Sequence, residues 1–195
     1  MFHAISCGWL MARARNPEDG LTMVFALVIQ AIARGNIKPP TLGMGMPWAM
    51  FSELLDQHFP GAGCEILDER FSESYSTESL LADEFQDIVE ILLDHRGSDD
   101  RNAEWLAHAV ASGCMGSDHL YHDMGLADRG MLSSLLERHF TALYRKNVHN
   151  MKWKKFFYKQ LCDRAEIVMC PARNCSSCVD YKKCFATEDA VAAAG

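Results

Sequence analysis

Four cysteines near the end of the chain place the strongest constraint on how it can fold. They follow the spacing C-x4-C-x2-C-x5-C, so half of the eight cysteines lie within fifteen of the 195 residues. Thiols this close in sequence can converge on one point at a small cost in chain entropy. We therefore expect an irregular loop in which the four sulfur atoms hold a metal centre. The four residues are Cys170, Cys175, Cys178 and Cys184.

Two kinds of metal centre fit four clustered thiolates, and a minor third reading is that the thiols stay unliganded. The first three cysteines repeat the C-x4-C-x2-C spacing of plant-type ferredoxins, which favours an iron–sulfur cluster. A structural zinc ion on four cysteines is the simpler alternative. Such zinc sites commonly pair two short cysteine knuckles across a longer loop, and that arrangement is absent from the sequence. The spacing thus favours a cluster over zinc without excluding zinc.

The charge of the chain is divided unevenly along its length. The formal net charge is −7, yet residues 145–185 hold ten Lys and Arg against three Asp and Glu. The positive section is the one that carries the four cysteines. It can offset a negatively charged metal–thiolate centre, attract an oxyanion, or dock an acidic partner. A basic surface can also bind nucleic acid, which stays an alternative at this point.

Hydrophobic periodicity predicts a mainly α-helical chain, and no convincing strand alternation is present. Helices are expected over residues 21–33, 48–59, 78–96, about 101–110, 119–124, 129–144 and 151–165. Their N-caps are expected at Asp19 or Gly20, Asp99 or Asp100, Asp118, and Asn150. We expect one compact unit with a helical domain over 1–165, a cysteine-rich metal-cluster loop over 166–186 and a flexible tail over 187–195.

The composition limits where the protein acts and what chemistry it performs. No apolar run approaches the roughly 18–20 residues that a membrane span needs. The N-terminus lacks the pattern of a secretory signal, so we expect a cytoplasmic protein with reduced thiols. No P-loop or dinucleotide fingerprint is present. We expect a carrier of a metal centre more than a turnover enzyme.

A second group of candidate ligands lies outside the cysteine run. The stretch CMGSDHLYHD contains Cys114, His119 and His122, and Cys162 lies eight residues before the quartet. They are candidates for a secondary or transient metal site. Residues of this kind more often cap helices or lie on a wet surface, and an isolated cysteine such as Cys162 is more often a buried apolar side chain.

Lysines on the expected final helix form a third group of candidates. The stretch MKWKKFFYKQLCDRA places an aromatic side on one face and lysines on another. The aromatic face fits a core better than a base-stacking surface, which argues against nucleic acid as the partner. The lysines are candidates for docking an oxyanion or a partner protein: Lys152, Lys154, Lys155 and Lys159.

The sequence over residues 113–185 resembles the NifQ family of nitrogenase molybdenum-donor proteins. The most specific parts are NMKWKKFFYKQLC at 150–162 and the C-x4-C-x2-C-x5-C run. The resemblance implies that the four cysteines ligate an iron–sulfur cluster of the [4Fe-4S] or [3Fe-4S] type. It also implies that molybdenum is carried as a mixed molybdenum–iron–sulfur cluster.

The resemblance further implies partners and a role. Molybdate would be the metal source, and the recipients would be the NifEN scaffold complex and the NifH reductase, which work in biosynthesis of the iron–molybdenum cofactor. Neither a membrane nor nucleic acid is expected as a partner. Two rival functions share parts of the pattern: a small iron–sulfur electron-transfer protein, and a zinc-stabilised binding module.

Overall fold

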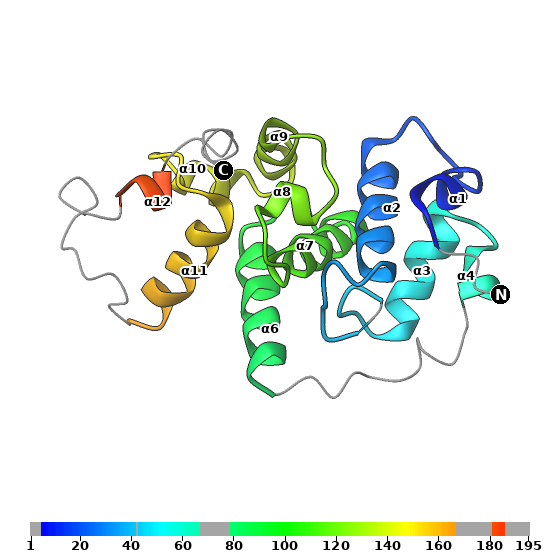
Figure 1. Ribbon diagram of the computed structural model, residues 1–195, viewed down its shortest axis with the longest axis horizontal. Coiled ribbons are helices and arrows are strands. Elements are labelled where there is room, and N and C mark those ends of the chain that lie inside the picture. The colour runs from blue at the N-terminus through cyan, green and yellow to red at the C-terminus, as the bar shows by residue number, and fades with distance from the viewer. Residues whose placement is uncertain (1–4, 42, 67–78, 167–180, 186–195) are drawn as a thin grey trace, which may run out of the picture.

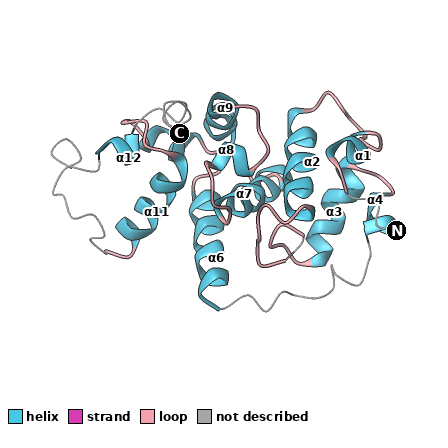
Figure 2. Cartoon of the chain, viewed as in Figure 1, coloured by secondary structure: helices cyan, strands magenta, loops and turns pink. Residues whose placement is uncertain are grey.

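The computed structural model describes residues 5–41, 43–66, 79–166 and 181–185, with the side chains of residues 79–82 left out. Within these ranges the regular structure is entirely helical, without a strand (Figure 2). The prediction of a mainly α-helical fold is confirmed. Most of the cysteine-rich segment lies outside the described residues, so the proposed division into helical domain, cluster loop and tail stays a prediction.

The helices follow one another in the order shown in Figure 1. The N-terminal ones are α1 (Cys7–Met11), α2 (Gly20–Ala33), α3 (Trp48–His58) and α4 (Ala62–Ile66). The central ones are α6 (Ser79–Asp94), α7 (Arg101–Cys114) and α8 (Leu120–Asp123). The C-terminal ones are α9 (Arg129–His139), α10 (Thr141–Lys146), α11 (Trp153–Arg164) and α12 (Tyr181–Phe185).

Helices α6 and α7 pack against each other at the centre of the body. Helix α2 packs against α7, and α1 packs against α2. Helix α11 packs against α6. As a result, α11 and α12 lie at the end of the molecule opposite α1, α3 and α4 (Figure 1). Large fully buried side chains fill the interior, among them Phe25, Phe51, Trp105 and Phe157. Among the described helices, none has the length and apolar character that crossing a membrane requires.

Local capping chemistry explains where several helices begin. The Asp19 carboxylate accepts from the Leu21 N–H at 3.2 Å, and Asp100 accepts from the Ala103 N–H at 2.8 Å. Of the predicted alternatives, Asp19 rather than Gly20 caps α2, and Asp100 rather than Asp99 caps α7. The predicted caps at Asp118 and Asn150 are wrong. His119 and Lys152 precede α8 and α11, and Asn150 has a left-handed φ of 53° before the second of these starts.

The prediction of a single helix over 129–144 is also wrong, because the helix is interrupted at Phe140. The Gly97 N–H donates to the His139 carbonyl at 2.8 Å, and this bond comes from a distant segment. Phe140 leaves the helical region, with φ −130° and ψ 48°, and its ring is completely buried. A tertiary hydrogen bond and a buried ring thus divide the stretch into α9 and α10.

The Gly/Met loop between α2 and α3 packs on the core. Met44 and Met46 are buried, and Met44 has a left-handed φ of 56°. The ring of His108, from α7, hydrogen-bonds to the Met44 backbone, while its Nδ1 atom has no partner among the described residues. The loop is therefore fixed to α7 by a buried histidine.

We expect the protein to lose stability as the pH falls below about 6.5, the usual pKa of an unfolded histidine. Burial lowers the pKa of His108 to about 4 and also lowers the pKa of His58. Between pH 6.5 and about pH 4, His108 binds a proton in the unfolded chain but not in the folded one. Lowering the pH in this range therefore stabilises the unfolded state relative to the folded state. The loss per histidine is up to about 1.4 kcal/mol per pH unit.

Urea unfolding followed by circular dichroism at pH 7 and pH 5 measures this effect. The unfolding midpoint should be lower at pH 5. A His108→Leu variant, which removes one of the histidines with a lowered pKa, should show a shallower dependence on pH. An equal slope in the variant and the unaltered protein would contradict the assignment to His108.

Candidate functional site

The structure describes one of the four clustered cysteines. Cys184 lies in α12 and is partly buried. Cys170, Cys175 and Cys178 lie outside the described residues. The expectation of an irregular loop around all four needs a correction at its end, because residues 181–185 form a helical turn around Cys184.

The first turn of α11 holds Cys184 in place. The backbone N–H of Lys152 donates to the Cys184 carbonyl at 2.9 Å. The ammonium of Lys155 lies 3.7 Å from the Cys184 sulfur. The N–H groups at the start of a helix lack partners within that helix and carry a partial positive charge. Cys184 therefore sits at a place suited to a negatively charged sulfur.

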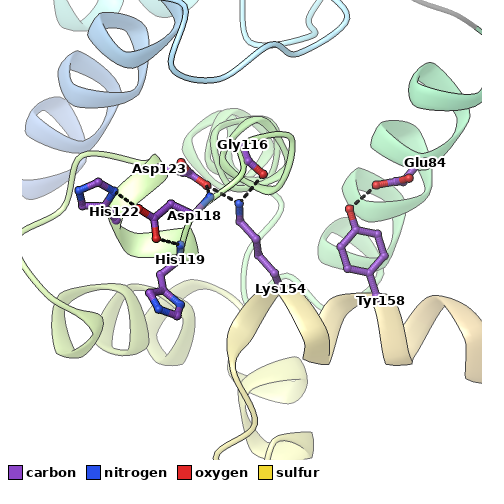
Figure 3. A network of polar contacts seen from close by, with 8 residues as sticks. All are labelled: Glu84, Gly116, Asp118, His119, His122, Asp123, Lys154 and Tyr158. Carbon is purple, nitrogen blue, oxygen red and sulfur yellow. Dashed lines mark hydrogen bonds and ion pairs between the residues drawn. The ribbon is translucent and has the colours of Figure 1, made fainter. Parts of the chain in front are cut away.

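The preceding residue of the same turn, Lys154, points toward Gly116 and Asp123 instead (Figure 3). Its ammonium pairs with the Asp123 carboxylate and donates to the Gly116 carbonyl at 2.9 Å. The side chains are only 16% and 7% exposed, so the pair is largely desolvated. The same carboxylate accepts from the Asp118 N–H at 2.9 Å. A Cβ at Gly116 would overlap the carboxyl group of Asp123.

Asp118, in the loop before α8, orients His122 of that helix. The Asp118 carboxylate accepts from the His119 N–H at 2.7 Å and lies 3.0 Å from Nδ1 of His122 (Figure 3). The His119 ring instead stacks on Tyr121, with centroids 6.1 Å apart. No set of three metal-binding side chains converges in the described part of the chain. The secondary metal role of His119 and His122 stays a prediction.

Cys114, at the end of α7, is buried next to the Lys154–Asp123 pair. Burial raises the pKa of its thiol to about 12, and the carboxylates of Glu84 and Asp123 act in the same direction. Lys154 acts in the opposite direction without reversing the shift. In the described conformation the thiol is therefore protonated at neutral pH and covered. Its secondary metal role stays a prediction.

Tyr158 joins α11 to α6 one turn after Lys154. Its hydroxyl donates to the Glu84 carboxylate (Figure 3). Burial, and next the hydrogen bond from the hydroxyl to Glu84, raise the pKa of Tyr158. Because Lys154 and Tyr158 are four residues apart, they share one face of α11. That face is fastened by polar contacts to both α6 and the α7–α8 turn.

The remaining candidates have separate surroundings. Cys162 is partly buried on α11. Lys159 pairs with Asp163 at 2.5 Å on the exposed side of the same helix, and Lys152 is partly exposed. The structure thus brings Lys152 and Lys155 together with Cys184, and turns Lys154 toward Asp123. Docking roles for the lysines stay predictions.

Sequence reasoning missed three members of this network: Glu84, Gly116 and Tyr158. Tyr158 and Glu84 are separated by 74 residues in the sequence, and Lys154 and Gly116 are separated by 38 residues. No local spacing rule connects residues at that separation. The only available signal was the four-residue spacing of Lys154 and Tyr158, which places two hydrogen-bonding side chains on one helix face.

Comparison with known proteins decides the family. The family model described as NifQ matches residues 24–186, which is most of the chain and includes all four clustered cysteines. The chain belongs to the NifQ family. Membership of the NifQ family implies a role in nitrogen fixation and in molybdenum handling.

Individual NifQ relatives agree with the family match. Protein NifQ of Azotobacter vinelandii is 34% identical over 189 residues, covering 92% of this chain and 88% of the relative. Protein NifQ of Rhodobacter capsulatus is 31% identical over 172 residues, covering 88% of this chain and 91% of the relative. Protein NifQ of Klebsiella pneumoniae is 38% identical over 82 residues, or 41% of this chain and 48% of the relative. No solved structure matches the chain.

Proposed function

We propose that this chain carries molybdenum to the biosynthesis of the iron–molybdenum cofactor of nitrogenase. The molybdenum is cargo, and the resident group is an iron–sulfur cluster of the [4Fe-4S] or [3Fe-4S] type on Cys170, Cys175, Cys178 and Cys184. The bound cargo is a mixed molybdenum–iron–sulfur cluster. The protein acts as a carrier and donor, not as a turnover enzyme.

The single observation that carries this proposal is the extent of the family match. It runs from residue 24 to residue 186 and so spans the whole cysteine quartet. The quartet also has a spacing that favours a cluster over a zinc knuckle pair. Family and donor set therefore support the same chemistry.

The surroundings of Cys184 fit such a cluster. Thiolates are soft ligands that suit iron–sulfur clusters, and a cluster on four of them is negatively charged. The Cys184 sulfur has an ammonium group 3.7 Å away, at Lys155. A positive group at that distance stabilises a negative metal–thiolate centre more than it stabilises a neutral, unliganded thiol.

The basic section that carries the quartet supports the expected exchange of cargo. Molybdate is an oxyanion, and positive charge attracts it. The same charge can steer the loaded carrier onto an acidic surface of a recipient. We propose the NifEN scaffold and the NifH reductase as those recipients, since they are the assembly proteins that the family resemblance implies.

Metal analysis tests the proposal. The protein would be purified without oxygen from cells supplied with molybdate, and iron, sulfide, molybdenum and zinc measured per chain, with paramagnetic resonance alongside. We expect a brown protein that contains iron and sulfide, with molybdenum below one atom per chain. Incubation with the NifEN and NifH proteins should then lower the molybdenum content of the carrier.

Two results would overturn the proposal. Zinc without iron would assign the quartet to a structural ion and remove the cargo site. A cluster that exchanges electrons but neither binds nor releases molybdenum would make the chain an electron-transfer protein.

A further inference from the structure

The first turn of α11 makes two lysine contacts in opposite directions. Lys154 reaches inward to Asp123 and Gly116, and both side chains of the ion pair are largely buried. Lys155 reaches outward to the Cys184 sulfur at 3.7 Å. The backbone of the two lysines is held against the body, because the flanking side chains of Trp153 and Phe156 are buried. The start of α11 is therefore packed against the body and contacts Cys184 through Lys152 and Lys155.

We propose that Lys155 is a positioning residue that holds the metal-bound sulfur of Cys184, and that Cys184 is the ligand by which the helical body anchors the metal centre. The proposal rests on the proposed function only for the identity of the metal group. The contacts themselves lie wholly within the described residues: the Lys155 ammonium meets the sulfur, and the Lys152 N–H meets the Cys184 carbonyl at 2.9 Å.

Two physical effects make this arrangement matter to a bound metal. An N–H donor directed at a ligating sulfur fixes the orientation of that ligand, and loss of such a partner commonly weakens metal binding 10- to 100-fold. Hydrogen bonds to cluster sulfurs also tune the reduction potential. Removing a positive donor disfavours the more negative, reduced state of a cluster and so lowers its midpoint potential.

Lys146 provides a control that distinguishes the specific Lys155–Cys184 contact from general positive charge. Lys146, on α10, also belongs to the basic section, and its ammonium contacts Nε2 of His95 at 2.7 Å. Lys146→Met therefore removes the same charge from the same section without touching the Cys184 sulfur. Lys155→Arg keeps both the charge and an N–H donor.

The experiment measures the rate at which purified protein releases its metal to a chelator, without oxygen, for these variants. Lys155→Met should release metal about tenfold faster than the unaltered chain, at the lower end of the range for lost outer contacts. Lys155→Arg and Lys146→Met should release it at close to the unaltered rate. In the iron-loaded protein, the midpoint potential of Lys155→Met should fall by about 59 mV, which is tenfold in the one-electron equilibrium.

A second pair of variants tests the backbone contact. Lys152 has φ −53°, a value that proline adopts, and Lys152→Pro removes the N–H that donates to the Cys184 carbonyl. Lys152→Ala removes only the side chain. If the body anchors the metal through Cys184, Lys152→Pro should release metal faster than Lys152→Ala.

The outcomes distinguish this inference from the proposed function. Equal release rates for Lys155→Met and Lys146→Met would overturn the role of Lys155, whatever metal is bound. Equal rates for Lys152→Pro and Lys152→Ala would overturn the role of Cys184 as anchor. Zinc in place of iron would overturn the proposed function while the release rates still decide the role of Lys155. A chain that binds no metal would overturn both.

Discussion

Replacing Lys154 with methionine should lower the free energy of unfolding by about 3–5 kcal/mol, the usual cost of breaking a buried ion pair from one side. The reason is the Asp123 carboxylate, which is 7% exposed and would remain in the interior without its cation. The Gly116 carbonyl would lose its donor as well. Methionine matches the length of the lysine stem, so the loss measures charge and hydrogen bonding more than volume.

Chemical denaturation followed by circular dichroism provides the measurement. Lys146→Met is the matched control, since it is the same substitution at an exposed lysine, and we expect a change below about 1 kcal/mol there. The double variant Lys154→Met with Asp123→Leu should recover most of the stability, because it leaves no buried charge unpaired. A single variant as stable as the control would show that the ion pair is not the buried, coupled contact described above.

Cys175→Ala should remove nearly all iron and sulfide from the purified protein while leaving its helical content largely intact. Cys175 stands between two closely spaced members of the quartet, so the remaining three thiols would have to bind a cluster across a gap. The described hydrophobic core is built from residues of α1 to α11 and the described loops between them, and these helices make up most of the described helical content. Metal content and fold should therefore respond separately.

The measurement compares iron and sulfide per chain with the far-ultraviolet circular dichroism of the same samples. Cys64→Ala is the control, because Cys64 is an exposed cysteine on α4 outside the quartet. It should leave both quantities unchanged. Iron retained in full by Cys175→Ala would argue against a ligand role for that residue.

The helices were predictable where local chemistry sets them. Asp19 and Asp100 cap α2 and α7 through their own side chains, three residues or fewer from the N–H groups they serve. Where a distant contact intervenes, the prediction failed. The break at Phe140 depends on a hydrogen bond from Gly97, and no periodicity within residues 129–144 signals it.

In the candidate site, too, features set by neighbours along the chain were predictable and features set by distant contacts were not. The cysteine quartet is visible in the sequence because its members are neighbours along the chain. The inward direction of Lys154 was not predictable, since its partner Asp123 lies 31 residues earlier. Four lysines in one amphipathic stretch look equivalent in sequence, yet packing gives Lys154 a carboxylate, Lys155 a sulfur and Lys159 the neighbouring Asp163.

The overlap between a Cβ at position 116 and the Asp123 carboxyl group ties position 116 to the buried ion pair. The carboxylate occupies the space that any larger residue at position 116 would need. A side chain at position 116 would displace the Asp123 carboxylate and remove it from its ion pair with Lys154. A larger residue at 116 should therefore disturb the Lys154–Asp123 pair, so the three positions depend on one another in this chain.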